Sequence, residues 1–190
     1  LDPQLRYIPQ LATEWRWGDD GRSLTLRLRD GVVFHDGTPM DAAAVKVNLD
    51  RYREARESRR KSELRSVSAV EVVDPLTVRL TLSQPDAPLL AVLANRAGMM
   101  VSPTARAELG EDFATMAAGA GPYRVVQWDK NSQLVLEAFP GYWRGEPEIE
   151  RVVYQPIADE AVRLTNLRSG AVQLVDTVPP QSIAQLEGDA

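Results

Sequence analysis

The stretch LATEWRWGDDGRSLTLRLRDGVVFHDGTPMDAAAVKVNLDRY, residues 11–52, contains the pattern that decides the fold. Large and polar residues alternate over residues 13–17 and again over residues 24–28. The Gly-Asp-Asp-Gly sequence between these runs tolerates the backbone angles of a tight turn, so the pattern predicts a β-hairpin. Residues 32–34 are expected to extend the sheet, and the sequence His-Asp-Gly-Thr-Pro to end the strand.

A helix is predicted directly after this turn. Asp41 is a good N-cap, because its side chain can accept a hydrogen bond from the free N–H groups of the first helical turn. The apolar residues that follow recur at spacings of three and four, which places them on one face of a helix ending near residue 57: Ala42, Val45, Leu49 and Tyr52. Seven basic and three acidic residues lie within residues 51–65. We interpret this stretch as the solvated end of the helix, with an edge that attracts anions as the alternative.

The rest of the chain alternates β-type runs with short helical patterns. Strands are expected at residues 67–73, 76–82, 99–101, 123–128, 133–138, 149–156 and 172–176, and helices at residues 87–94, 104–109, 159–168 and about 180–186. The β-α-β-α order at the end favours some parallel pairing. The small residues before Pro122 indicate a division near residue 118. The sequence therefore predicts an α+β (mixed α/β) fold in two parts.

Composition excludes several classes of function. The chain has 190 residues, 44% of them hydrophobic, and a net charge of −5, which argues against binding to a nucleic acid backbone. It contains no cysteine, so disulfides, thiolate nucleophiles and zinc fingers are excluded. No run approaches the roughly 20 apolar residues of a membrane span. The sequence favours a folded globular protein without nucleic acid as a partner.

Catalytic patterns are missing from the sequence. The only histidine, His35, precedes Asp36, and neighbouring side chains on an extended chain point in opposite directions, so we expect a turn and not a catalytic dyad. Carboxylates are scattered along the chain, the adjacent Asp19-Asp20 and Glu111-Asp112 are only pairs, and no phosphate-binding glycine loop or GxSxG motif is present. We predict no catalytic residue, no metal site and no cofactor. A hydrolase that uses two carboxylates, and a module that adds a peptide strand to its sheet, stay as alternatives.

The ordered motifs resemble the signature region of the family 5 extracellular solute-binding proteins, which are receptors of peptide, nickel and related ABC importers. The family pattern has Leu-Ala, then Trp, an Asp-Gly turn, a strand ending in Leu-Arg, then Phe-x-Asp-Gly-x-Pro and a helix. The matching residues are Leu11, Ala12, Trp15, Asp20, Gly21, Leu28, Arg29, Phe34, Asp36, Gly37, Pro39 and Val45. Gly121-Pro122-Tyr123 is similar to the family's G-T-G-P-[YF], with Ala120 in place of threonine, and Tyr142-Trp143 is similar to its Y-W-x-G-x-P element.

This resemblance implies a fold and a function. The fold is that of the type II periplasmic-binding proteins, of which the chain represents a fragment of the N-terminal lobe. Residues 1–117 then form its smaller, hairpin-rich subdomain, and residues 118–190 an incomplete part of its main subdomain. Such a protein is not an enzyme: it binds a peptide or similar small solute between two lobes and delivers it to the transmembrane subunits of an ABC permease.

The resemblance also implies a location and a set of binding residues. We expect a monomer in a bacterial periplasm or outside the cell, free or lipid-anchored, whose export signal is absent from this chain. By position, residues 58–60 and 95–99 resemble places where relatives contact the ligand, so Arg59, Arg60, Arg96 and Met99 are the candidate ligand-binding residues. An arginine can grip a carboxylate, and a methionine adapts to apolar groups. Peptide, nickel chelate, glutathione-like and oligosaccharide cargoes all stay open.

Overall fold

The computed structural model describes residues 2–183. The chain divides into two compact units: residues 1–128 with 135–152, and residues 129–134 with 153–190. The boundary predicted between residues 117 and 118 concerns the subdomains of a whole lobe, and it stays a prediction.

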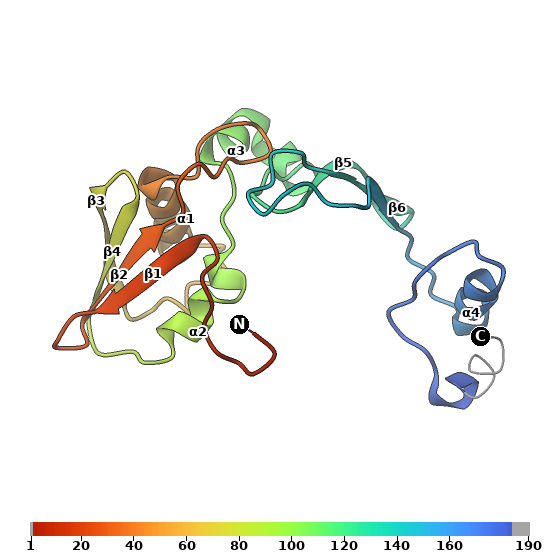
Figure 1. Ribbon diagram of the computed structural model, residues 1–190, viewed down its shortest axis with the longest axis horizontal. Helices are drawn as coiled ribbons and strands as arrows, with labels where there is room; N and C mark the ends of the chain where they lie inside the picture. Colours follow the sequence, from red (N-terminus) through yellow and green to blue (C-terminus); the bar gives the residue numbers. More distant parts are fainter. Residues whose placement is uncertain (1, 184–190) are drawn as a thin grey trace. The chain divides into compact units, whose positions relative to one another are not determined.

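The first unit contains a four-stranded antiparallel sheet with the strand order β1-β2-β4-β3 (Figure 1). Its strands are β1 (Ala12–Trp17), β2 (Ser23–Leu28), β3 (Val67–Asp74) and β4 (Thr77–Leu82). Both predicted hairpins are confirmed, and Gly21, with φ of 65°, has the left-handed conformation that its turn requires. The pairing of β2 with β4 joins the two hairpins.

One face of this sheet is buried and the other is exposed, as a period of two requires. The buried side chains on β2 and β4 are Leu24, Leu26, Leu28, Val78, Leu80 and Leu82. Helix α1 (Ala42–Glu54) packs on β3 and β4, and it buries the predicted Ala42, Val45 and Leu49. The predicted cap is also confirmed, since Asp41 accepts a hydrogen bond of 2.8 Å from the Ala44 N–H.

Helix α1 ends at Glu54, so the predicted end near residue 57 is wrong. Ala55 leaves the helix with ψ of 134°. The Ser58 hydroxyl then donates to the Tyr52 carbonyl at 2.6 Å, which satisfies an acceptor that a further helical turn would otherwise use. A side-chain hydrogen bond therefore replaces the last turn.

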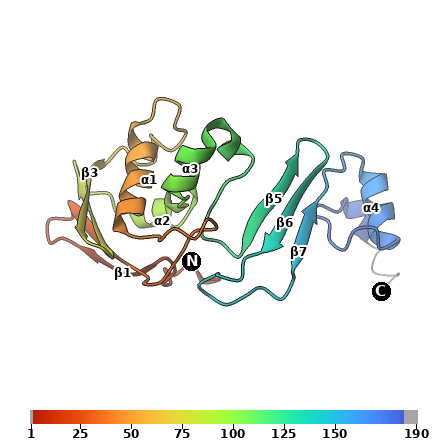
Figure 2. The ribbon, with the colours of Figure 1, turned by 90° about the horizontal axis from the view of Figure 1, so that it is seen from above.

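Short helices connect the sheet to the rest of the first unit. They are α2 (Leu89–Leu93), η1 (Arg96–Gly98), α3 (Pro103–Leu109) and η2 (Gly110–Ala114), and α3 lies beside α1 (Figure 2). Ser102 caps α3, and Gly110 ends it with φ of 54°. The predicted strand at residues 99–101 is wrong, because only Val101 forms a β-bridge, with Gly119.

A second sheet has the strand order β5-β6-β7, from β5 (Tyr123–Asp129), β6 (Gln133–Ala138) and β7 (Arg151–Tyr154). The predicted hairpin of β5 and β6 is confirmed, and β7 is shorter than predicted. Helix α4 (Glu160–Arg168) begins after Asp159, whose side chain accepts from the Val162 N–H at 2.9 Å.

The strand predicted at residues 172–176 is wrong, and the parallel pairing expected for it does not form. Apolar residues alternate there, but a strand also needs a hydrogen-bonding neighbour, and no described strand pairs with this segment. Leu174 is 81% exposed as a result. After it comes η3 (Pro180–Ser182), and the later part of the helix predicted to about residue 186 lies outside the described residues.

Candidate functional site

Tyr52, on the last turn of α1, connects the two segments that were predicted to contact a ligand. Its hydroxyl donates to the Met99 carbonyl at 2.7 Å, and its own carbonyl accepts from the Ser58 hydroxyl at 2.6 Å. The loop that contains Arg59 and the turn that contains Arg96 are therefore anchored on the same residue. Sequence reasoning placed Tyr52 only on the apolar face of the helix and missed this role.

The four side chains predicted to bind the ligand differ in their exposure and in their ion pairs. Arg59 and Arg96 are exposed, and no carboxylate within residues 2–183 forms an ion pair with either of them. Met99 is 61% exposed and offers an apolar surface. Arg60 differs, because its guanidinium pairs with Glu63 at 2.5 Å. Arg59, Arg96 and Met99 are thus available to a ligand without breaking a contact.

A further cation lies at Tyr52. The guanidinium of Arg51 lies over the Tyr52 ring, 4.6 Å from its centroid. Such stacking holds an arginine in place while leaving its N–H groups able to donate. The segments that Tyr52 holds thus carry the exposed Arg59, Arg96 and Met99. These side chains and Arg51, here called the surface around Tyr52, are of the types that bind the anionic and apolar groups of a solute.

Asn48 fixes the backbone beside Met99. Its side-chain amide donates to the Val101 carbonyl at 2.8 Å and accepts from the Val101 N–H at 3.2 Å, and it also donates to the Ala44 carbonyl at 2.9 Å. Only 1% of Asn48 is exposed. One buried side chain thus satisfies both backbone groups of Val101, as a neighbouring strand would. The sequence contained one sign of this role: Asn48 is a polar residue directly beside the apolar Leu49 on the helix that was predicted after Asp41.

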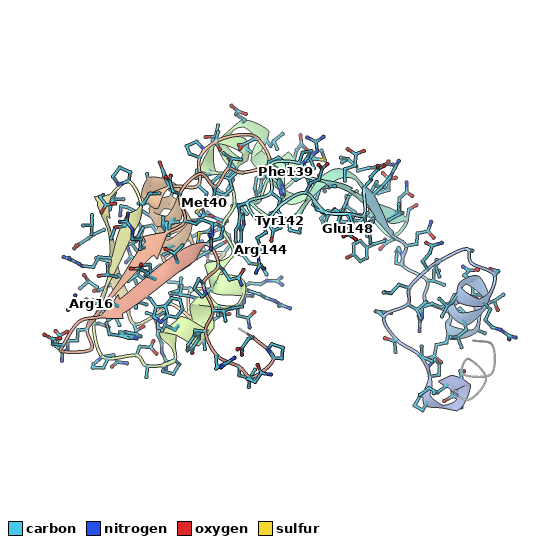
Figure 3. All side chains as sticks on the ribbon, in the orientation of Figure 1. Arg16, Met40, Phe139, Tyr142, Arg144 and Glu148 are labelled. Carbon is cyan, nitrogen blue, oxygen red and sulfur yellow. The ribbon has the colours of Figure 1, made fainter. Side chains whose placement is uncertain are left out.

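His35 has a structural role, as predicted. Its Nδ1 accepts from the Gly119 N–H at 3.1 Å, and its Nε2 lies 3.0 Å from the Gly121 carbonyl. The imidazole is therefore neutral, with its proton on Nε2. Its ring contacts Phe139 edge-on, with centroids 5.0 Å apart; Phe139 is labelled in Figure 3. Burial lowers the pKa of His35 below its usual 6.5.

Asp36 faces different partners. Its carboxylate accepts from the Ser102 hydroxyl, from the Thr38 N–H at 3.0 Å and from the Thr38 hydroxyl at 2.7 Å. Partial burial alone would raise the pKa of Asp36, but the hydrogen bonds from Ser102 and Thr38 outweigh it, and the pKa is lowered. His35 and Asp36 thus fasten one turn at two places and do not form an acid–base pair.

Residues 2–183 lack two further arrangements. They contain no group of three or more His, Cys, Asp or Glu side chains that could hold a metal ion. Within the same residues, no helix combines the length and the apolar character needed to cross a membrane.

The sequence matches a family model over residues 6–190, that of the bacterial extracellular solute-binding proteins, family 5 Middle. It is 34% identical over 189 residues to the glutathione-binding protein GsiB of Escherichia coli O1:K1 / APEC, a match that covers 98% of this chain and 37% of that protein. The chain therefore spans little more than a third of the length of the curated relatives that it matches.

Solved structures of similar proteins share the same arrangement of elements. The binding protein AgaA of A. tumefaciens R10, in complex with agropinic acid, matches with a TM-score of 0.86 and 31% identity, over 95% of this chain and 37% of AgaA. A nickel ABC transporter protein of Bacillus halodurans matches with a TM-score of 0.83 and 29% identity, over 94% and 36% of the two chains. The protein DppA of Helicobacter pylori, in complex with the peptide STSA, matches with a TM-score of 0.82 and 26% identity, over 95% and 40%.

Proposed function

Because the chain belongs to the bacterial extracellular solute-binding proteins of family 5, we propose that the protein containing it is the substrate-binding component of an ABC importer. Members of this family are periplasmic proteins that bind small ligands or peptides and work with ABC permeases; they are solute-binding proteins and not enzymes. The predicted periplasmic-binding-protein-like fold of mixed helices and sheets is confirmed by the agreement with solved structures. The match over residues 6–190 is the observation that carries the proposal.

In this proposal the protein binds a peptide or a similar small solute between two lobes. The ligand shifts the two lobes toward their closed arrangement only to the extent that it binds the closed state more tightly than the open state. The protein then delivers the solute to the transmembrane subunits of its permease. It acts as a monomer in the periplasm or at the outer surface of the cell, either free or held by a lipid anchor.

The surface around Tyr52 is the proposed contact of this chain with the solute. Two observations support it: Arg59 and Arg96 are exposed without an ion pair in the described part of the chain, and the exposed Met99 lies on the turn that Tyr52 holds. Arg60 contributes only if the solute displaces Glu63 from its guanidinium. A solute with a carboxylate and an adjacent apolar group suits these side chains.

Reversing the charge of Arg96 tests this site. In the full-length receptor, Arg96→Glu is expected to weaken binding of a carboxylate solute at least about tenfold, or about 1.4 kcal/mol, because an attractive charge becomes a repulsive one. The measurement is calorimetric titration with glutathione and with a short peptide, using whichever binds the unchanged receptor.

Arg79→Glu is the matched control, because Arg79 is also exposed but lies on β4, in the sheet. It should leave the affinity within about twofold of the unchanged receptor, since exposed charges far from a ligand are screened. Equal affinities of the Arg96 and Arg79 variants would remove Arg96 from the site. If neither solute, nor any other small molecule that co-purifies, binds the unchanged receptor, the proposed function itself fails.

A further inference from the structure

Three hydrogen bonds join His35 to the segment that leads into β5. The His35 N–H donates to the Gly119 carbonyl at 2.8 Å, the Gly119 N–H donates to Nδ1 at 3.1 Å, and Nε2 donates to the Gly121 carbonyl at 3.0 Å. All of these residues belong to the first unit. The side chain thus uses one ring nitrogen as an acceptor and the other as a donor, which only the neutral imidazole can do.

We propose that His35 is a pH-sensitive latch, whose neutral imidazole holds residues 119–121 against the turn of residues 34–38 and whose protonation loosens this hold at the Gly119 amide. A proton on Nδ1 turns that nitrogen into a donor that faces the Gly119 N–H, which is also a donor. The Gly119 N–H has no other hydrogen-bond acceptor among the described residues. Uptake of one proton therefore removes one hydrogen bond and creates a repulsive contact in its place.

The charged groups near the ring do not cancel this effect. Asp36, the next residue in the chain, favours the protonated imidazole, but its carboxylate is occupied by Thr38 and Ser102. Arg124 on β5 disfavours the protonated form, and Glu137 on β6 lies 3.7 Å from the Arg124 guanidinium. Burial of the ring against Phe139 has the largest influence on the pKa of His35 and disfavours the charge, whereas the hydrogen bond to the Gly121 carbonyl, the next largest influence, favours it; burial prevails and the pKa is lowered.

The direction of the pH dependence follows from this environment. The pKa of His35 in the folded chain lies below the 6.5 of a free histidine, so the unfolded chain takes up the proton first as the pH falls. The contribution of the latch to stability is therefore complete above pH 6.5 and is lost as the pH falls below 6.5 through the folded pKa.

The chain is suited to a direct test because His35 is its only histidine, so every imidazole signal in an NMR spectrum belongs to it. The 190-residue chain is labelled with ¹⁵N and titrated from about pH 8 to about pH 4.5, which spans the range of histidine titration. The expected result is a His35 midpoint below 6.5. At the same midpoint, exchange of the Gly119 amide, corrected for its intrinsic pH dependence, should become about tenfold faster.

Two variants separate the latch from other causes. His35→Gln keeps one donor and one acceptor but does not titrate, so it should abolish the pH-dependent step in Gly119 exchange. Asp36→Asn removes the neighbouring carboxylate and should keep the step. A His35 midpoint at or above 6.5, a Gly119 amide that does not respond, or a step that persists in His35→Gln would overturn the proposal. No solute enters this test, so its failure leaves the proposed function untouched.

Discussion

Replacing Phe34 with alanine is expected to lower the free energy of unfolding by about 3–5 kcal/mol. None of the Phe34 side chain is exposed, and it belongs to the core cluster that includes Leu24 and Leu49. Alanine removes most of the ring and leaves a cavity that the well-packed surroundings can fill only in part. Urea-induced unfolding near pH 7.5, above the range in which histidine titrates, measures the loss.

Two further variants make this expectation specific. Phe34→Leu keeps much of the apolar volume and should cost less than half as much as Phe34→Ala, because the residual cavity is smaller. Val47→Ala removes an apolar side chain that is 51% exposed on α1, and it should change stability by less than about 0.5 kcal/mol. A loss below about 1 kcal/mol for Phe34→Ala would contradict the tight packing of this core.

Phe34 also fixes the start of the turn that carries His35 and Asp36. Its N–H donates to the Thr38 carbonyl at 2.8 Å, and its carbonyl accepts from the Gly37 N–H at 2.9 Å. Gly37 has φ of 81°, which an L side chain rarely adopts. The motif Phe-His-Asp-Gly therefore combines a core anchor, a histidine that holds distant backbone, an aspartate that binds the distant Ser102 hydroxyl, and a glycine that the turn requires.

Replacing Asn48 with leucine is expected to cost about 2–4 kcal/mol, because it leaves the Val101 N–H and carbonyl without their partner. Leucine has a similar size, so the loss reports the missing hydrogen bonds and not a cavity. Urea-induced unfolding measures the free energy, and hydrogen exchange at the Val101 amide should quicken at the same time.

Glu54→Leu is the control for this substitution, since it places leucine on the last turn of the same helix at a side chain that is 62% exposed. It loses only a surface ion pair with Arg53, and it should change stability by no more than about 0.5 kcal/mol. If Asn48→Leu and Glu54→Leu changed the free energy of unfolding equally, the hydrogen bonds of the buried Asn48 amide would make no specific contribution to stability. The same comparison in the full-length receptor would show whether Val101 must be held for the Met99 turn to bind a solute.

Local patterns were sufficient for the elements that form most of the first unit. Alternation of apolar and polar residues predicted both hairpins of the sheet, and the spacing after Asp41 predicted α1. Local sequence patterns gave wrong predictions where the secondary structure of a segment depends on pairing with a distant segment. Residues 172–176 have the alternation of a strand, but no described strand pairs with them.

The candidate site shows the same limit. The sequence offered arginines and a methionine, but it could not show that Tyr52 and Asn48 hold the turn and loop that carry them, since Tyr52 to Met99 and Asn48 to Val101 are long-range hydrogen bonds. The ion pair between Arg60 and Glu63 is different, because a spacing of three within a turn brings two such residues together and is visible in the sequence.

The order of strands in the first sheet has a consequence for how the chain reaches its native state. Each hairpin closes between neighbouring residues, an event that takes microseconds. The central pairing of β2 with β4 instead joins strands that are separated in sequence by α1 and β3, so a long loop must close when it forms. We therefore expect formation of this central pairing to limit the refolding rate. Until it forms, the unpaired edges of β2 and β4 are sites at which molecules of the same protein can aggregate.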